Sequence, residues 1–314
     1  MRVIITGGTG FIGRQLAEEL LANGYEVVAL SRNPDTANGL PDRVRIERWD
    51  ARTSVGWGSL ADGGHTDGGV AIVNLAGENL AGEGFFPSRW TDQRKARLRD
   101  SRLNAGKAVV EAIEQAAVKP RVVIQSSGIG HYGSRADTVL TEEDPAGNDF
   151  LARLTVDWEA STAPVKAFGV RHVSIRSAVV LSPDEGALKR LILPFRLFVG
   201  GPMGSGKQGF PWIHPADEVG GIRFLIEHES ATGPFNLVAP EALIYAQFGV
   251  KLARVLGRPY WLPLPAFALR AALGEVASTV LDGQLAQPKK LLDMGYKFKF
   301  PTAEAALRDV IQGR

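Results

Sequence analysis

The glycines near the amino terminus have the spacing of a turn that binds phosphate groups. Gly7, Gly10 and Gly13 follow the apolar segment 2–5 and precede apolar residues at helical spacing. One glycine allows the turn, one lets a pyrophosphate approach the backbone, and one lets helix and strand pack closely. Amides at the start of the helix would then face the phosphates. This pattern predicts a dinucleotide site, and the alternative is a glycine-rich turn without a ligand. The expected contacts are Gly7, Thr9, Gly10, Phe11, Ile12 and Gly13.

Ser31 and Arg32 indicate which dinucleotide is bound. NAD-specific proteins place Asp or Glu about 20 residues beyond the glycines, where the carboxylate accepts from the ribose 2′-hydroxyl. Here that place holds Ser31-Arg32-Asn33. A hydroxyl and a guanidinium can both donate to a 2′-phosphate, and the guanidinium plane can stack on adenine. We therefore expect NADP(H), the alternative being that Arg32 is a solvated loop residue.

The composition excludes several classes of protein and site. The 314 residues are 45% hydrophobic and carry a formal net charge of +2, which favours neither nucleic acid nor an anionic membrane as a partner. Cysteine is absent, so disulfides and thiolate chemistry are excluded. No apolar run approaches about 18 residues, and the first apolar run is too short for a signal peptide. We expect a cytoplasmic protein, and the sequence leaves its oligomeric state undecided. No metal site is expected from the five histidines, His65, His131, His172, His214 and His228.

Strands and helices are predicted to alternate through about residue 180. The predicted strands are 27–30, 44–46, 70–74, 121–125 and 173–181, and the predicted helices begin at residues 11, 91 and 150 and end near 23, 117 and 166. This alternation is typical of an α/β doubly wound parallel (Rossmann) sheet, whose ligands lie beyond the carboxyl ends of the strands. We expect a Rossmann domain over 1–183 and a smaller, mostly helical lobe over 184–314, with some segments near 210–240 returning to the first domain.

Two other patterns have plainer interpretations. Residues 201–207 fit the start of an ATP-type phosphate loop, but Gln208 replaces the magnesium-binding hydroxyl and Pro211 blocks the helix, so this match is rejected. Several arginines lie in the first half of helix 91–117. They form either a solvated face or, for one or two of them, a contact with cofactor phosphates or an acidic substrate.

Segments 6–13, 74–78 and 158–160 together resemble the extended short-chain dehydrogenase/reductase superfamily. Segments 194–196, 200–202 and 210–214 resemble its atypical epimerase-like subfamily, which has a small terminal domain of its own, here from about Leu262 to Ile311. The resemblance implies that further positions line the NADP site. These are Ser31, Arg32, Leu75, Ala76, Gly77, Glu78, Arg102, Ser126 and Glu159.

The resemblance also implies where catalytic residues should lie. The superfamily uses a tyrosine and a lysine four residues later, and the matching positions hold Leu151 and Thr155. The position of the serine or threonine that polarises a carbonyl holds Gly128, although a shift of one residue brings Ser127 there. If catalysis persists, we expect Tyr132 to donate the proton and Ser127 to bind the carbonyl, with Glu159 or Arg102 orienting cofactor or substrate. The alternative for Tyr132 is packing beside the nicotinamide, and His131 is expected to be its packing neighbour.

Two functions are compatible with these residues. One is an NADP(H)-dependent oxidoreductase or epimerase-like enzyme that binds an unidentified small molecule between its lobes, which Ser127, Tyr132 and His214 favour. The other is a catalytically degenerate NADPH-binding protein that acts as a sensor through a partner. The absence of tyrosine and lysine at 151 and 155 favours the second.

Overall fold

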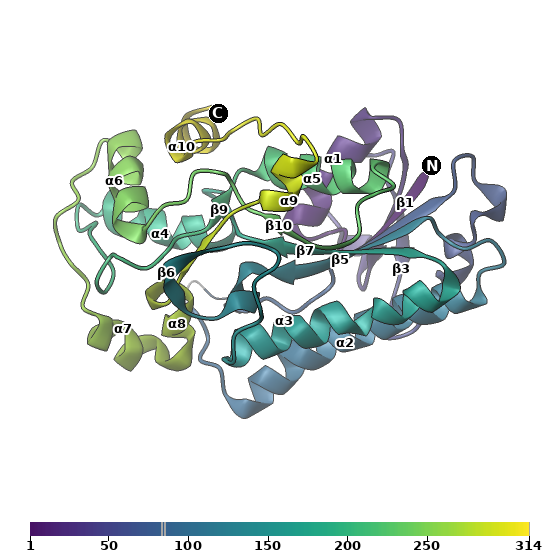
Figure 1. Cartoon of the computed structure of the whole chain (residues 1–314), viewed down its shortest axis with the longest axis horizontal. Coiled ribbons are helices and arrows are strands. Elements are labelled where there is room, and N and C mark those ends of the chain that lie inside the picture. Colours follow the sequence, from purple (N-terminus) through teal and green to yellow (C-terminus); the bar gives the residue numbers. More distant parts are fainter. Residues whose placement is uncertain (83, 85, 314) are drawn as a thin grey trace.

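A seven-stranded parallel sheet forms the centre of the protein (Figure 1). The structure is a computed structural model that describes residues 1–82, 84 and 86–313, without the side chains of residues 65, 136 and 137. The strand order is β10-β7-β5-β4-β1-β2-β3. This confirms the predicted doubly wound sheet. The strands are β1 (Arg2–Thr6), β2 (Glu26–Ser31), β3 (Arg45–Arg48), β4 (Val70–Asn74), β5 (Val122–Gly128), β7 (Arg171–Ser177) and β10 (Gly233–Leu237).

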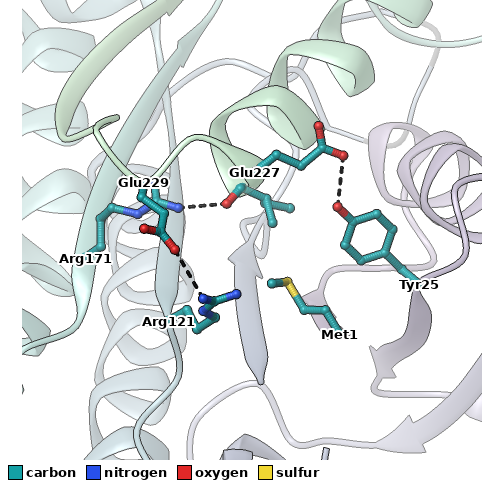
Figure 2. A pocket seen from close by; sticks show the side chains of 7 residues that line it. Met1, Tyr25, Arg121, Arg171, Glu227 and Glu229 are labelled. Carbon is teal, nitrogen blue, oxygen red and sulfur yellow. Dashed lines mark hydrogen bonds and ion pairs between the residues drawn. The ribbon is translucent and has the colours of Figure 1, made fainter. Parts of the chain in front are cut away.

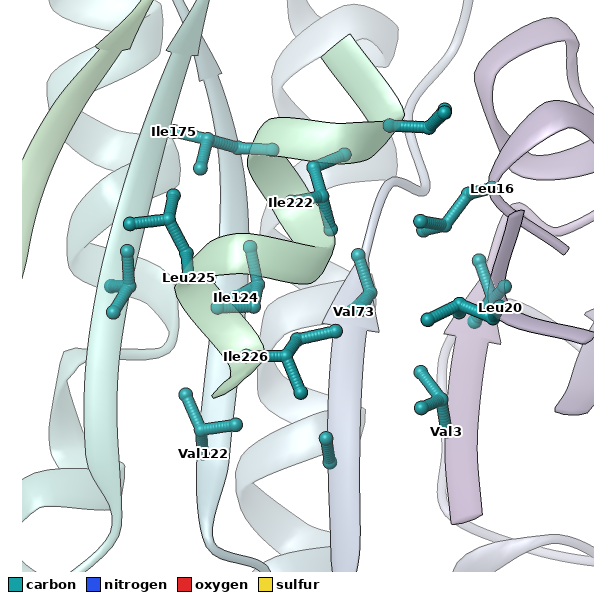
Figure 3. Packing of buried hydrophobic residues seen from close by; sticks show 14 of the residues in the cluster. Val3, Leu16, Leu20, Val73, Val122, Ile124, Ile175, Ile222, Leu225 and Ile226 are labelled. Carbon is teal, nitrogen blue, oxygen red and sulfur yellow. The ribbon is translucent and has the colours of Figure 1, made fainter. Parts of the chain in front are cut away.

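Helices cover both faces of the sheet. One face packs against α1 (Phe11–Ala22) and α5 (Pro215–Glu227), where Leu16, Leu20 and Ile222 meet strand residues such as Val3 and Ile124 (Figure 3). The other face packs against α2 (Asp92–Gln115) and α3 (Phe150–Ser161). Because both faces are covered, β1, β2 and β4 contain unbroken apolar runs (3–5, 27–30 and 70–73) rather than an apolar residue at every second position.

Most predicted elements lie within a few residues of their expected bounds, and two end early. The predicted helix 150–166 is α3 followed by the 3₁₀ turn η5 (Ala163–Phe168), because Thr162 turns inward and donates to Gln125. The predicted strand 173–181 ends at Ser177. The chain then forms β8 (Val179–Val180), which pairs with β9 (Trp212–Ile213) in a separate small sheet.

A smaller lobe follows the sheet in the sequence. Its own core contains Phe195, Phe248 and Leu307. Within segment 210–240, α5 and β10 belong to the main sheet assembly, and segment 201–207 contains no helix. The helices of the lobe are α4 (Gly186–Arg196), α6 (Tyr245–Leu256), α7 (Ala266–Leu273), α8 (Ser278–Leu281) and α10 (Ala303–Gln312), whereas α9 (Lys289–Asp293) packs against β10 of the main sheet. None of the described helices is long and apolar enough to cross a membrane.

The remaining elements are short. A second pair of parallel strands, β6 (Arg135–Leu140) and β11 (Gln284–Ala286), joins the segment after β5 to the smaller lobe. The 3₁₀ turns are η1 (Pro34–Thr36), η2 (Gly58–Ala61), η3 (Gly63–His65), η4 (Ile129–Tyr132) and η6 (Gly274–Ala277).

The glycine turn gives a first prediction. A Cβ at Gly13 would lie 2.6 Å from the carbonyl oxygen of Gly7 and 2.7 Å from the Cα of Gly8. Both neighbours are backbone atoms that cannot move aside, so Gly13→Ala should lower the free energy of unfolding by about 1–3 kcal/mol in urea denaturation. Gly10→Ala is the matched control, since its Cβ has one contact at 3.2 Å. Equal losses for the two variants would contradict this account.

Candidate functional site

The turn between β1 and α1 is shaped to receive a phosphate. Gly7 has a φ of +68°, and a Cβ there would lie 3.2 Å from the backbone of Ala76. Gly10 caps α1 and donates from its amide to the Gly7 carbonyl over 3.0 Å. Its lack of a side chain leaves the first-turn amides of α1 without a side-chain cap. Such amides and the helix dipole favour an anion.

Hydrogen bonds fix the segment after β4 against this turn. The Thr6 hydroxyl donates to Asn74 Oδ1 over 2.5 Å and accepts from the Ala76 amide over 3.2 Å. The Asn74 side-chain amide donates in turn to Gln125 Oε1 over 2.8 Å. All three side chains are buried, so they align the carboxyl ends of β1, β4 and β5. Leu75 and Ala76, at the start of the segment 75–78 predicted to contact the cofactor, consequently border the glycine turn.

Ser31 and Arg32 lie at the same edge of the sheet, because β2 runs parallel to β1. Ser31 is buried, and its hydroxyl accepts from the Asn33 amide over 3.2 Å. The Arg32 side chain is exposed. An exposed guanidinium at this edge can reach a ligand that extends beyond β2.

A cavity of about 250 Å³ lies beyond the carboxyl ends of β5 and β7. Ser127 and Gly128 line it from β5, and Ser177 from β7. Residues 278–280 and 282–284 of the smaller lobe line another part of its wall. The cavity therefore lies where a doubly wound sheet places its ligands.

The two positions at which the superfamily carries tyrosine and lysine both line this cavity. Leu151 presents an aliphatic side chain. Thr155 also lines the wall, and its hydroxyl donates to the Ala152 carbonyl of its own helix over 2.8 Å. Neither side chain can replace a tyrosine whose phenol is activated by a lysine ammonium group.

Ser127 belongs to a buried polar cluster. Its hydroxyl donates to Glu159 Oε1 over 2.7 Å. Arg176 binds the same carboxylate through Nε at 2.9 Å and Nη2 at 3.1 Å. Burial acts to raise the pKa of Glu159, but the hydrogen bonds and charge of Arg176 outweigh it and hold that pKa below its ordinary value. Glu159 is therefore an ionised group that orients Ser127.

Tyr132 does not reach the cavity. It is 0% exposed, it donates to Asn236 Oδ1 over 2.7 Å, and it accepts from Arg176 Nη1 over 3.0 Å. Burial raises the pKa of its phenol, although Arg176 opposes the shift. The expectation that Tyr132 donates a proton directly to a substrate conflicts with this placement, because η4 turns the ring inward and its hydroxyl is already engaged.

His131 and His214 are held in contacts that support the fold. Burial lowers the pKa of His131 to about 4, so the ring is neutral at pH 7, and Nδ1 lies 3.5 Å from Glu159. This agrees with the expected packing role. His214, which was expected to border the cleft, instead caps α5 by accepting from the Ala216 amide, and its ring stacks on Phe300.

Arg102 is a buried cation at the cavity wall. It is 5% exposed, and its guanidinium lies over the Trp158 ring at 4.6 Å. Nη1 donates to the Glu78 and Leu98 carbonyls, while Nε is buried without a hydrogen-bond partner. Burial lowers the pKa of Arg102 to about 10, so it stays charged at pH 7. A buried guanidinium of this kind favours a bound anion.

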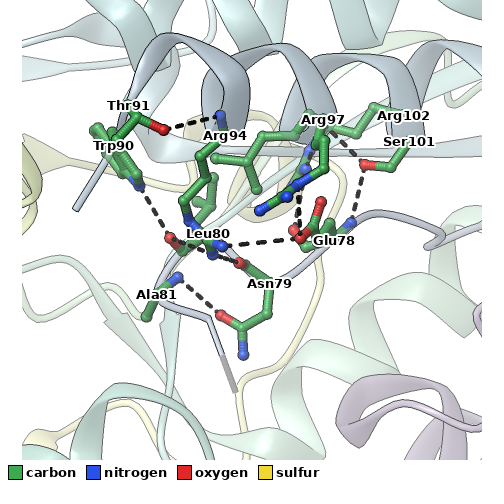
Figure 4. A network of polar contacts seen from close by, with 11 residues as sticks. Glu78, Asn79, Leu80, Ala81, Trp90, Thr91, Arg94, Arg97, Ser101 and Arg102 are labelled. Atoms are coloured by element: carbon green, nitrogen blue, oxygen red, sulfur yellow. Dashed lines mark hydrogen bonds and ion pairs between the residues drawn. The ribbon is translucent and has the colours of Figure 1, made fainter. Parts of the chain in front are cut away.

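Two other arginines of α2, Arg94 and Arg97, contact Glu78 and its loop (Figure 4). Arg94 Nη1 and Arg97 Nε each lie 3.8 Å from Glu78 Oε1, and Arg94 Nη2 donates to the Asn79 carbonyl over 2.8 Å. The Glu78 amide donates to Ser101 Oγ over 3.1 Å. These contacts hold the loop in place. They show Glu78 among arginines rather than facing the cavity.

A hollow of about 510 Å³ lies at the opposite edge of the sheet, at the amino ends of the strands (Figure 2). Arg121 pairs with Glu229 at 3.1 Å, and Arg171 donates to carbonyls at the end of α5. Tyr25 donates to Glu227. Its charged groups are already paired and it lies away from the glycine turn, so its greater volume does not make it the better site.

Four residues of the site were not predicted from the sequence: Arg176, Ser177, Glu218 and Asn236. Arg176 had a visible signal, because a charged residue next to the buried Ile175 in strand 171–177 requires a buried partner. Nothing in local spacing shows that Asn236 meets Tyr132 or that Glu218 meets Ser177.

Comparisons with known proteins agree with this architecture. The NAD dependent epimerase/dehydratase family matches residues 3–237, and a domain of unknown function, DUF1731, matches residues 264–310. The chain is 36% identical over 315 residues to the epimerase family protein YfhF of Bacillus subtilis, covering 100% of this chain and 99% of that one. A chloroplastic SDR39U1 homolog of Arabidopsis thaliana is 35% identical, over 99% of this chain and 87% of its own.

A solved structure extends the likeness to three dimensions. The crystal structure of the human epimerase family protein SDR39U1 with NADPH superposes with a TM-score of 0.85 at 34% identity, covering 100% of both chains. The matches run through the glycine turn, the sheet and the smaller lobe. This chain belongs to the NAD dependent epimerase/dehydratase family of extended short-chain dehydrogenases/reductases.

Proposed function

We propose that this protein is an NADP(H)-dependent oxidoreductase or epimerase-like enzyme acting on a small molecule in the 250 Å³ cavity. The observation that carries the proposal is the position of that cavity: it opens at the same strand ends as the glycine turn, and Ser127 lines it. The human relative with NADPH supports the cofactor assignment.

The residues present fit such a dinucleotide. Residues 7–13 would hold the pyrophosphate, with Ser31 and Arg32 at the 2′-phosphate and segment 75–78 with Ser126 along the cofactor. NADP(H), when bound, supplies or accepts a hydride. Glu159 holds the Ser127 hydroxyl in place without substrate, and that hydroxyl would turn from Glu159 to donate to the substrate oxygen. Arg102 offers a positive charge to an anionic group of cofactor or substrate.

A second candidate is a nucleotide-binding sensor without catalysis. Its support is the presence of Leu151 and Thr155 where the superfamily carries its tyrosine and lysine. The two candidates differ in one measurement. An enzyme oxidises bound NADPH when a suitable carbonyl compound is added, whereas a sensor binds NADPH and leaves it unchanged with every member of a broad aldehyde and ketone panel.

Ser127→Ala tests the proposed substrate contact. We expect the rate of NADPH oxidation to fall by about 10²-fold or more, the range for removal of one positioned hydrogen-bond donor. NADPH affinity, followed by cofactor fluorescence, should change little. Ser230→Ala serves as a control, because this serine is exposed in the segment after α5 and does not line the cavity. An unchanged rate in Ser127→Ala would remove Ser127 from the mechanism.

Arg32→Ala tests the choice of cofactor. Loss of a hydrogen bond to a charged phosphate should weaken NADPH binding by about 1.5–3 kcal/mol and leave NADH binding nearly unchanged. Arg254→Ala, an exposed arginine on α6, provides the control. Equal weakening for NADPH and NADH would overturn the assignment to NADP(H).

Tyr132→Phe separates packing from chemistry. The variant removes a hydroxyl that bonds both Asn236 and Arg176 inside the protein. Leaving those groups unpaired should lower the free energy of unfolding by about 1–3 kcal/mol in urea denaturation. The rate of NADPH oxidation should fall less than in Ser127→Ala. A normal stability with a Ser127→Ala-like rate would restore Tyr132 as a direct donor.

A further inference from the structure

A second serine–glutamate pair meets the cavity from the opposite face of the sheet. Ser177 lines the cavity at the end of β7. Its hydroxyl lies 2.6 Å from Oε1 of Glu218, in the first turn of α5. Along β7, Val173 and Ile175 pack toward α5, whereas Arg176 reaches Glu159 on α3. Ser177 therefore faces α5, while the Ser127–Glu159 pair lies on the α3 side.

Glu218 is buried without a compensating cation. It is 1% exposed, and its second oxygen, Oε2, is buried without a hydrogen-bond partner. Burial raises the pKa of this carboxyl to about 8, and the hydrogen bond from Ser177 only partly opposes the shift. At pH 7 the group is mainly a neutral carboxylic acid.

The charged groups on the elements around Glu218 are engaged elsewhere. Asp217, its neighbour on α5, accepts from the amides of Lys299 and Phe300. Arg223, one turn further along α5, binds Glu19 of α1 and Glu227.

The remaining titratable groups nearby give no cation either. Tyr296 donates to the Asp217 carbonyl, and burial is the main cause that raises the pKa of its phenol. His214, at the start of α5, is bonded to Asp309, and burial lowers its pKa. Among the described residues, no cation is within ion-pair distance of the Glu218 carboxyl.

Neither Tyr132 nor Glu159 can supply the proton that the proposed oxidoreductase needs. Tyr132 is buried away from the cavity, and Glu159 is held ionised by Arg176. We propose that Glu218, acting through the hydroxyl of Ser177, supplies the proton that accompanies hydride transfer to a carbonyl substrate. This inference rests on the oxidoreductase function proposed above.

The step balances in atoms and electrons. NADPH delivers a hydride to the carbonyl carbon and becomes NADP⁺, and the carbonyl π bond opens toward oxygen. The Ser177 hydroxyl, which donates to Glu218 Oε1 before the reaction, turns to the substrate oxygen and gives it its proton, and Ser177 Oγ takes the carboxyl proton of Glu218. The products are the alcohol, NADP⁺ and a Glu218 carboxylate, which regains a proton from water. In the direction of alcohol oxidation the same groups carry the proton back.

The test compares Glu218→Gln and Ser177→Ala with wild type and with Glu227→Gln, a control on the same helix outside the cavity. NADPH oxidation is followed between pH 6 and 9.5 with 4-nitrobenzaldehyde and a panel of ketones as probes. The wild-type rate should fall as pH rises through about 8, because Glu218 loses its proton there. Glu218→Gln should be slower by about 10²-fold and lose that pH dependence, with unchanged NADPH affinity. Ser177→Ala should behave alike, and Glu227→Gln like wild type.

A second readout needs no substrate. The pKa of Glu218 in the folded protein is about 8, above its ordinary 4.5, so the folded state holds an extra proton between these values. Stability from this group should therefore be full below about pH 4.5 and fall as pH rises toward 8. Relative to wild type, Glu218→Gln should gain melting temperature steadily from pH 5 to 8, whereas Glu227→Gln should not.

The two readouts distinguish the possible failures. A melting-temperature difference that does not change with pH means that Glu218 is already ionised, which overturns the proposal. A Glu218→Gln variant with the wild-type rate and pH profile overturns it as well. If wild type binds NADPH but reduces none of the probes while the melting temperatures shift as expected, the proposed enzymatic function fails and the proton-donor role falls with it, whereas the neutral state of Glu218 stands.

Discussion

The buried ion pair between Arg176 and Glu159 is the interaction on which the site depends. Arg176 grips both oxygens of the carboxylate, and one of these oxygens also accepts from Ser127. A third guanidinium nitrogen donates to Tyr132. Taking two charges out of water is costly, and good geometry with further hydrogen bonds is what offsets the cost. Here one pair ties α3, β5, β7 and η4 together at the carboxyl edge of the sheet.

The two glutamates near the cavity differ because their surroundings differ. Glu159 shares its burial with a guanidinium, which keeps the carboxylate ionised. Glu218 is buried with only a serine hydroxyl, which cannot balance a charge, so the neutral acid is favoured. Carboxyl groups driven to opposite protonation states in one site are suited to opposite tasks in proton transfer. Glu159 fixes the orientation of Ser127, and Glu218 offers an exchangeable proton.

Sequence spacing predicted the parts of the protein that depend on near neighbours. The glycine turn, strand 70–74 and the helix capped by Thr91 follow from residues a few positions apart, so their bounds agree closely with the structure. The inward turn of Tyr132 could not be predicted. Its partner Asn236 lies 104 positions away, and only the closing of the sheet by β10 brings the two together. Glu218 was missed for the same reason, being 41 residues from Ser177.

The proposed cofactor site and one wall of the substrate cavity come from different regions of the chain. The glycine turn, segment 75–78 and the ends of β5 and β7 come from the region matched by the epimerase/dehydratase family. The wall residues 278–280 and 282–284 come instead from the region matched by the terminal domain. They are joined to the sheet domain through β11, which pairs with β6, the strand that follows η4. A change in the terminal domain can therefore reshape one wall of the cavity while the amides of the glycine turn stay in place. The choice of substrate then depends on residues that the glycine turn does not constrain.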